Sequence, residues 1–174
     1  EVIKNKIKVN DIIVAIPSNG IHSNGYSLIR NILKHKKINF VKNRFLKKEL
    51  IKPTKIYVDE ILKLNKLKLI NGCAHITGGG LHDNIKRIIP KNLNASINLN
   101  KIKTLEIFKW IKKQGISEKE MLKTFNCGIG FCLIINKNNF KKIFKIFPKN
   151  FKPYVLGTIT KGSSKVSLNG KIDW

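Results

Sequence analysis

A run of three glycines stands between a short apolar segment and a stretch with helical periodicity, in the string CAHITGGGL at 73–81. Glycine has no Cβ atom, so consecutive backbone N–H groups can converge on an anion, and a following helix adds its unpaired N-terminal donors. One or two glycines would be enough for a tight turn. Three in a row therefore predict close approach of a phosphate-bearing ligand, at Thr77, Gly78, Gly79 and Gly80.

Two other segments carry small and polar residues beside apolar runs: PSNGIHSNGYS at 17–27 and TFNCGIG at 124–130. Short Ser and Asn side chains commonly bond the backbone of their own turns, which is the purely structural alternative. Taken with the triple glycine, the three loops predict one composite ligand site. Its further candidate binding residues are Ser18, Gly20, Ser23, Asn24, Gly25, Asn126 and Gly128.

Two histidines lie in these loops and are the candidate catalytic residues, His75 beside the glycines and His22 in the first loop. Imidazole gains or loses a proton near neutral pH and suits acid or base chemistry. A buried histidine with satisfied hydrogen bonds is the competing interpretation for each. His35 lies among lysines and is expected to be exposed, and His82 follows the glycines with no partner visible in the sequence.

The three cysteines form no CxxC pair and no zinc-site spacing, so they are predicted to be reduced thiols, with Cys132 buried. Cys73 and Cys127 adjoin the loops, and a nucleophilic role for them is the minority interpretation. No metal ligand can be named. The chain contains no apolar stretch of membrane-spanning length and no signal-peptide pattern, which predicts a soluble, intracellular protein. It begins without methionine, as expected if residues have been removed or if the chain is part of a longer one.

The balance of 35 Lys and Arg against 10 Asp and Glu gives a formal net charge of +25. Such a charge raises the possibility of nucleic-acid binding. The lysines are, however, spread over almost every segment without an arginine-rich tract or interleaved aromatic residues. Joint over-use of Lys, Asn and Ile favours a compositional bias, while a basic nucleic-acid-binding module remains the alternative function.

Strands and helices alternate without a strict βαβ repeat, which predicts an α+β (mixed α/β) domain. Apolar or alternating runs predict strands or extended structure at 11–16, 67–76, 95–99, 129–135, 154–159 and 165–168. Helical spacing predicts helices around 28–33 with Ser23 or Asn24 as cap, from Pro53 to Leu64, at 81–89, at 104–115, after a capping box at 117–120, and at 140–147. Residues 34–52 are expected to form a surface connection with a short helical piece.

Together, the three strings resemble the C-terminal half of the phosphoribosylformylglycinamidine cyclo-ligase (aminoimidazole ribonucleotide synthetase) family, over nearly the whole chain. Ser18 to Leu28 match its Ser-Ser-Gly-x-His-Ser-Asn-Gly-Tyr-Ser-Leu string, with Asn19 as a variation. Residues 74–80 and 124–130 match its other two strings, and PTKIYV at 53–58 fits an intervening helix. The amidotransferase and thiamine-phosphate kinase families share the architecture but lack this set.

The resemblance implies ATP-dependent ring closure of formylglycinamidine ribonucleotide to 5-aminoimidazole ribonucleotide in de novo purine (IMP) biosynthesis, in the cytoplasm. It places the ribose phosphate at 77–80, with His75 nearby, and implies ATP and Mg²⁺. The whole chain, 1–174, would be the single C-terminal domain, and the family's N-terminal ATP-binding and dimerisation domain would be absent. The full-length enzyme is expected to be a homodimer, and this chain alone is expected to be inactive.

Three positions depart from the family pattern. Lys123 stands where arginine commonly precedes Thr-Phe-Asn, which replaces a planar fork by a point charge. Asp83 and Lys86 stand where glutamate and proline are common. Besides the nucleic-acid-binding module, a purely structural partner domain that binds no ligand is a third possible function.

Overall fold

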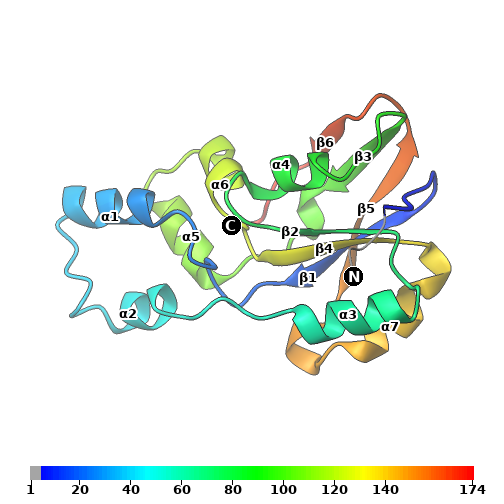
Figure 1. The fold of residues 1–174 in the computed structure, drawn as a ribbon. Coiled ribbons are helices and arrows are strands. Elements are labelled where there is room, and N and C mark those ends of the chain that lie inside the picture. Colours follow the sequence, from blue (N-terminus) through cyan, green and yellow to red (C-terminus); the bar gives the residue numbers. More distant parts are fainter. Residues whose placement is uncertain (1–4) are drawn as a thin grey trace.

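A computed structural model describes residues 5–174, in which six strands form one mixed sheet in the order β2-β4-β1-β5-β3-β6 (Figure 1). All neighbouring strands are antiparallel except the parallel pair β3 and β6. This mixed sheet flanked by helices confirms the α+β class. The strands are β1 Ile12–Pro17, β2 Gly72–His75, β3 Leu93–Asn98, β4 Ile129–Ile135, β5 Tyr154–Lys161 and β6 Val166–Asn169.

Strand β1 is central because its side chains are apolar on both faces. Ile13 and Ala15 belong to one hydrophobic cluster, and Val14 and Ile16 belong to the other. Alternate side chains of a strand point to opposite faces, so a continuous apolar run is stable only where both faces are covered. β4 is built in the same way and pairs with β1.

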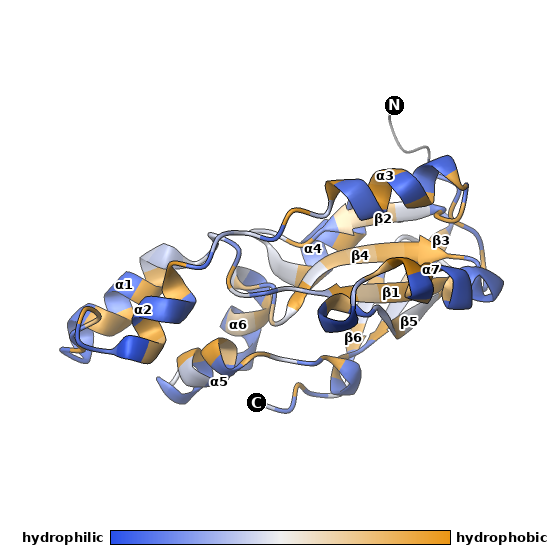
Figure 2. Cartoon of the chain, turned by 90° about the horizontal axis from the view of Figure 1, so that it is seen from below, coloured by the Kyte–Doolittle hydropathy of each residue, from blue (hydrophilic) through white to orange (hydrophobic). Residues whose placement is uncertain are grey.

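Helices α3 and α7 cover the face that carries Val14 and Ile16 (Figures 1 and 2). Each buries one apolar stripe: Ile61 and Leu64 from α3, and Ile143 from α7. Figure 2 shows their outer surfaces to be mainly hydrophilic, as expected of amphipathic helices on a sheet. The bounds are α3 Val58–Lys66 and α7 Phe140–Ile146.

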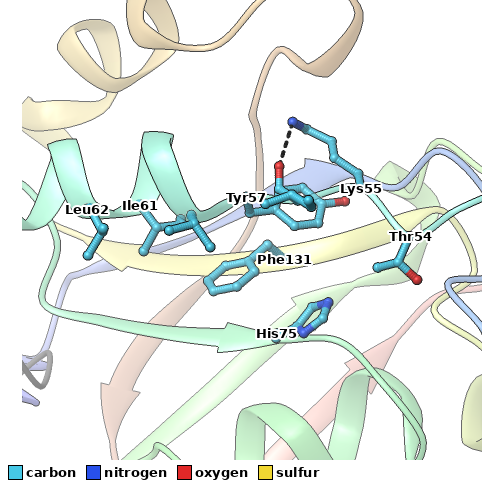
Figure 3. Close-up of a pocket in the computed structure, with 9 residues that line it drawn as sticks. Thr54, Lys55, Tyr57, Ile61, Leu62, His75 and Phe131 are labelled. Atoms are coloured by element: carbon cyan, nitrogen blue, oxygen red, sulfur yellow. Dashed lines mark hydrogen bonds between the residues drawn. The ribbon is translucent and has the colours of Figure 1, made fainter.

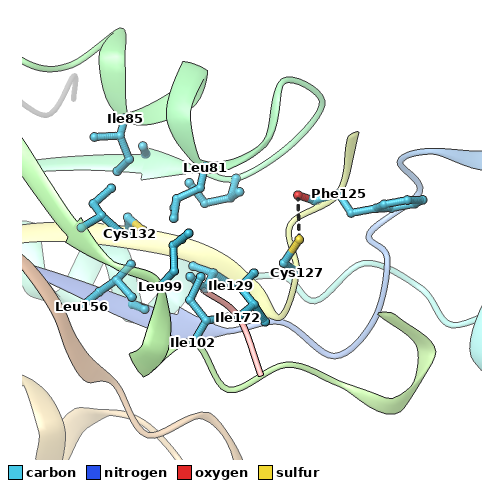
Figure 4. Close-up of a cluster of buried hydrophobic side chains, with 14 of the residues drawn as sticks. Leu81, Ile85, Leu99, Ile102, Phe125, Cys127, Ile129, Cys132, Leu156 and Ile172 are labelled. Carbon is cyan, nitrogen blue, oxygen red and sulfur yellow. Dashed lines mark hydrogen bonds between the residues drawn. The ribbon is translucent and has the colours of Figure 1, made fainter. Parts of the chain in front are cut away.

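The larger cluster lies on the other face and includes residues of five helices (Figure 4). α1 and α2 extend beyond the strand ends at one side of the domain (Figures 1 and 2). The bounds of these helices are α1 Tyr26–His35, α2 Arg44–Leu50, α4 Gly80–Lys86, α5 Glu106–Lys113 and α6 Glu118–Thr124. Three single-turn 3₁₀ helices complete the described structure: η1 Leu99–Lys101, η2 Lys137–Asn139 and η3 Lys149–Phe151.

Local patterns predicted several elements correctly. The strand at 129–135 has the predicted bounds, and the predicted capping box starts α6, where the Ser117 side chain accepts a hydrogen bond from the Glu120 backbone N–H. The surface connection after α1 contains one short helix, α2. No helix among residues 5–174 combines the length and apolar character needed to span a membrane.

Two predicted helix starts were wrong. Neither Ser23 nor Asn24 caps α1, whose N-cap is Gly25 in the left-handed region (φ 75°). α3 begins at Val58 rather than at Pro53, and Ile56, which lies within the predicted helix, is outside α3 and 78% exposed. The segment before α3 is instead held in a non-helical path by hydrogen bonds to the first loop, described below.

Candidate functional site

The three motif loops meet at one end of β1, β2 and β4. Backbone hydrogen bonds join them: Ser18 N–H donates to the Gly128 carbonyl (2.9 Å), and Ile76 N–H donates to the Gly130 carbonyl (3.0 Å). A Cβ atom added to Gly25 would lie 2.2 Å from the Phe125 ring, so the first and third loops are also in direct contact. The predicted composite arrangement of the loops is therefore present in the fold.

Asn126 joins the loop at 17–27 (the first loop) to the loop at 124–130 (the third loop). Its side chain is buried. Its Oδ1 accepts hydrogen bonds from the Ser18 hydroxyl (3.0 Å) and from Gly128 N–H (2.9 Å). Its Nδ2 donates to the Gly20 carbonyl at 2.9 Å. The side chain is thus occupied by bonds within the chain, and it sets the shape of the loops.

The triple glycine forms a turn in which Gly79 (φ 91°) and Gly80 (φ 63°) both adopt left-handed backbone. A Cβ atom on Gly80 would lie 1.8 Å from the Leu122 carbonyl oxygen, so only glycine allows this close contact with α6. Gly78 is exposed, Thr77 and Gly79 are half-buried, and Gly80 is buried. The most accessible part of the turn is therefore at Gly78.

Asn84 holds this turn, and sequence reasoning missed it. Its Nδ2 lies 2.7 Å from the Gly80 carbonyl, 3.3 Å from the Gly78 carbonyl and 3.4 Å from the Thr77 carbonyl. Its Oδ1 accepts a hydrogen bond from the Thr77 hydroxyl (3.4 Å). The only signal in the sequence was that Asn84, a polar residue, stands on the helix face that also carries the apolar Leu81 and Ile85.

His22 is buried, with 4% of its surface exposed, and both it and Ser23 have positive φ angles (52° and 60°). Such backbone is costly for residues other than glycine and is maintained only by the surrounding structure. His22 Nε2 lies 2.7 Å from the Asn19 side-chain oxygen. Burial, together with the nearby His75 and Lys55, lowers the pKa of His22 to about 4, so the ring is neutral at pH 7.

His75 ends β2 and is exposed. Its ring stacks on Phe131 of the neighbouring strand, with centroids 5.6 Å apart and planes 19° apart. Its centroid lies 6.4 Å from that of His22 and 6.1 Å from that of Tyr57. Partial burial lowers its pKa, so it too is mainly neutral at physiological pH.

A pocket of about 390 Å³ opens between the start of α3 and the edge of the sheet (Figure 3). Figure 3 shows the rings of His75 and Phe131 along neighbouring strands, with Tyr57 and Lys55 across from them. Most of its surface is apolar, and four of its lining residues, Thr54, Lys55, Tyr57 and His75, have polar side-chain groups. The lining residues are Thr54, Lys55, Ile56, Tyr57, Val58, Ile61, Leu62, His75 and Phe131.

Lys55 is held at the rim of this pocket. Its ammonium group contacts the Glu60 carboxylate at 3.1 Å and lies 5.0 Å from the centre of the Tyr57 ring and 4.5 Å from that of Phe151. The Tyr57 hydroxyl donates to the Pro17 carbonyl at 3.0 Å. The Tyr57–Pro17 bond connects the segment before α3 to the first loop.

Three further candidate binding residues form turns or contact neighbouring loops. Ser23 is exposed, and its hydroxyl lies 3.5 Å from that of Thr54. The Asn24 side chain donates to the His22 carbonyl (2.8 Å), and Gly25 begins α1. Asn24 also reaches the triple glycine, since a Cβ atom on Gly78 would lie 3.6 Å from its Oδ1.

The remaining histidines and the three cysteines do not line the pocket. His35 is exposed, and His82 pairs with Asp83 (2.8 Å) on the exposed side of α4. Cys132 is fully buried, as predicted, and burial raises the pKa of the thiols of Cys73, Cys127 and Cys132. Raised thiol pKa values do not favour a nucleophile. Within residues 5–174, no group of three or more His, Cys, Asp or Glu could hold a metal ion.

The fold and the three joined loops define a domain of the AIR synthase related class. Residues 8–169 match the family described as "AIR synthase related protein, C-terminal domain", and the chain belongs to this family. It is 43% identical over 163 residues to the phosphoribosylformylglycinamidine cyclo-ligase of Clostridium tetani, covering 93% of this chain and 49% of that protein. It is 41% identical over 150 residues to the trifunctional purine biosynthetic protein adenosine-3 of Chironomus tentans, covering 82% of this chain and 11% of that protein.

Solved structures show the same fold at low identity. The thiamine-monophosphate kinase of Stenotrophomonas maltophilia K279a matches 97% of this chain and 53% of its own, with a TM-score of 0.68 and 13% identity. Phosphoribosylformylglycinamidine synthase II of Thermotoga maritima matches 92% of this chain and 23% of its own, with a TM-score of 0.56 and 15% identity. The chain spans about half the length of the curated cyclo-ligases that it matches, and the comparisons give no support to a nucleic-acid-binding module.

Proposed function

We propose that this chain supplies the C-terminal half of the active site of a phosphoribosylformylglycinamidine cyclo-ligase. The observation that carries the proposal is the meeting of the three motif loops beside a pocket that His75 lines. Asn126 joins two of these loops, and the Ile76–Gly130 backbone bond joins the third. Two relatives with the cyclo-ligase name are 43% and 40% identical to this chain over aligned regions that cover 93% of it. The chain covers about half of these relatives, and the other half of the site would come from the N-terminal part of such an enzyme.

The proposed reaction closes an imidazole ring in two steps. The formyl oxygen of formylglycinamidine ribonucleotide takes the terminal phosphoryl group of ATP, and ADP leaves. A nitrogen of the same substrate then forms a bond to the activated carbon. The carbon–oxygen bond breaks, phosphate departs with that oxygen, and the nitrogen loses its proton. The products are 5-aminoimidazole ribonucleotide, ADP and phosphate.

The triple-glycine turn is the proposed binding site for the ribose phosphate of the substrate. Gly78 is its most exposed residue, and the side chain of Asn84 occupies the carbonyls of the turn, which would otherwise repel an anion. Thr77 and the adjoining Asn24 bring further polar side chains to the same place. The wall of the ligand site beside this turn would be shaped by the hydrogen bonds among Ser18, Gly20, Asn126 and Gly128.

Magnesium does not fit the described residues, since they contain no suitable cluster of acidic or other ligating side chains. No step is therefore assigned to a metal on this chain. We assign the metal ligands and the main ATP contacts to the N-terminal half. For the full-length enzyme we propose a cytoplasmic homodimer, with this chain alone inactive.

Calorimetric titration with formylglycinamidine ribonucleotide tests the proposal. We expect stoichiometric binding that persists from moderate to high salt and weakens in His75→Ala and in folded Gly79→Val. Binding that is lost in high salt would instead indicate non-specific attraction to a basic surface. Gly115→Ala, at a left-handed position with no atoms within 4 Å, is the matched control for backbone strain.

If the isolated chain binds no nucleotide, the titration is repeated with the N-terminal half of a cyclo-ligase relative added. Recovery of binding and of ring closure supports a split site. A mixture that assembles but shows neither binding nor ring closure contradicts the proposal.

A further inference from the structure

Asn19 connects the buried His22 to the segment that precedes α3. Its side-chain oxygen lies 2.7 Å from His22 Nε2, and its Nδ2 donates to the Pro53 carbonyl at 3.0 Å. Asn19 is also the residue at which this chain varies from the Ser-Ser-Gly string that it otherwise resembles. Its two bonds join the first loop to the non-helical segment before α3, part of which lines the pocket.

These two bonds determine which nitrogen of His22 carries the proton. A carbonyl only accepts, so the Asn19 nitrogen must face Pro53 and the Asn19 oxygen must face the ring. The ring nitrogen at 2.7 Å from that oxygen must therefore be a donor, which places the proton on Nε2. The backbone N–H of Asn19 also points at this nitrogen, at 3.4 Å, and would need it as an acceptor. A protonated Nε2 cannot accept that bond, so the two contacts exclude each other. The much shorter contact with the side-chain oxygen, at 2.7 Å, decides where the proton lies.

The other ring nitrogen, Nδ1, is then an unprotonated acceptor. It is buried and has no hydrogen-bond partner among the described residues. Both nitrogens of His22 are thus withheld from solvent, one by its bond to Asn19 and the other by burial. His75 lines the pocket and is exposed.

We infer that Asn19 is a positioning residue that holds His22 as the neutral Nε2–H tautomer behind the pocket, leaving His75 as the histidine that meets the ligand. The second half of this inference rests on the proposed function. The first half concerns the ligand-free chain and stands independently of any substrate.

The groups around His22 favour its neutral form. His75 from β2 and Lys55 from the segment before α3 both disfavour a second positive charge, and burial acts in the same direction. The Tyr57 ring centroid lies 5.9 Å from that of His22. Its hydroxyl donates a hydrogen bond to the Pro17 carbonyl, and the uncharged ring does not stabilise a charged His22. The pKa of His22, lowered to about 4, agrees with the geometry.

Nitrogen NMR of the histidine rings tests the tautomer in the ligand-free chain, with His22→Gln used to assign the signals. We expect a protonated Nε2 and an unprotonated Nδ1 from pH 8 down to pH 5. In Asn19→Ala the backbone N–H becomes the remaining neighbour of Nε2, and the tautomer shifts toward Nδ1–H. In Asn19→Asp the acceptor is kept, so the Nε2–H tautomer remains and the pKa of His22 rises.

Asn31→Ala on the exposed side of α1 is the control and should leave the His22 signals unchanged. A wild-type Nδ1–H tautomer, or wild-type His22 signals in a folded Asn19→Ala protein, would overturn the inference. Either result would do so whether or not the chain binds nucleotide.

Acylation by diethyl pyrocarbonate at pH 7, read by peptide mass spectrometry, tests which histidine is available. We expect His75 to react at least tenfold faster than His22, and His22 to react faster in Asn19→Ala. Equal rates in the folded wild-type chain would show that His22 is as available as His75 and would contradict the assignment. Titration with formylglycinamidine ribonucleotide remains the separate test of the proposed function.

Discussion

The Ser18 hydroxyl donates a hydrogen bond to the Asn126 side chain at 3.0 Å, across 108 residues of sequence. This buried bond links the loop after β1 to the loop before β4. β1 and β4 are antiparallel neighbours, so the end of β1 lies beside the start of β4. The loops at these two ends carry two of the three motifs. The triple-glycine turn follows β2, which pairs with β4 on the side away from β1.

Asn126→Ala should destabilise the domain by about 2–4 kcal/mol, because it removes three buried hydrogen bonds. Ser18→Ala should cost about 1 kcal/mol, and the double variant should cost less than the sum because the two share a bond. Urea unfolding measures all three, with Asn31→Ala as a surface control. Strict additivity of the two substitutions would show that the Ser18–Asn126 bond contributes nothing.

Gly80→Ala should destabilise the domain much more than Gly115→Ala. Both residues have positive φ angles, which cost an alanine about 1–2 kcal/mol. Only at Gly80 would the new Cβ atom collide with backbone, at 1.8 Å from the Leu122 carbonyl oxygen. Thermal and urea unfolding of the two variants separate the collision from the strain. Similar losses of stability in both would contradict the close contact.

Acidification should destabilise the domain through His22. Its folded-state pKa, about 4, lies below the unfolded value of 6.5, so the unfolded chain binds more protons between these pH values. The contribution is complete above pH 6.5 and is lost as the pH falls to about 4. We expect a loss on the order of 2 kcal/mol in urea unfolding over this window.

His22→Gln should make that pH profile shallower, and His35→Gln on exposed α1 should not. His75 adds to the wild-type decline in the same direction, since its pKa is also lowered. An unchanged slope in His22→Gln would show that His22 is not the group that titrates.

Ser117→Ala should cost about 1 kcal/mol, because the Ser117 hydroxyl caps α6 by accepting the Glu120 N–H bond at 3.2 Å. Ser23→Ala should cost less, since Ser23 does not cap α1. Circular dichroism during urea unfolding gives both values. A larger loss of stability for Ser23→Ala than for Ser117→Ala would contradict the assignment of Ser117, and not Ser23, as a helix cap.

The three thiols should differ in reactivity. Cys73 is half-buried, whereas Cys127 and Cys132 are buried. Iodoacetamide at pH 7.5 should alkylate Cys73 first, and slowly, because burial raises its thiol pKa. The other two should react only as the chain unfolds in urea. Rapid alkylation of folded Cys127 would indicate an activated thiol and would reopen its candidacy as a nucleophile.

Much of the framework could be predicted from local chemistry. The β4 run from Ile129 to Ile135 is apolar at every alternate position on both faces, which suits only a strand covered on two sides. The Ser117 capping box requires no information beyond four neighbouring residues. The glycine run at 78–80 likewise indicates a turn, and Gly79 and Gly80 adopt left-handed backbone there that other residues rarely adopt.

The uses of the asparagines could not be predicted in the same way. Asn19, Asn84 and Asn126 are chemically alike in the sequence, yet one orients a histidine, one holds the glycine turn and one joins two loops. The start of α3 depends similarly on distant contacts, because Asn19 and Tyr57 tie the segment at 53–57 to the first loop.

By itself, the sequence determined the α+β framework, most of the strand positions and the family, because these depend on short-range periodicity and on short motifs. The predicted extended stretch at 67–76 was too long, since β2 begins only at Gly72 and Lys68 has a left-handed backbone. Only the tertiary structure decided which polar groups bond to each other and which face the pocket. A buried side chain must find its hydrogen-bond partner in whatever segment packs against it, and that segment can lie a hundred residues away. The difference between buried His22 and exposed His75 arises in this way.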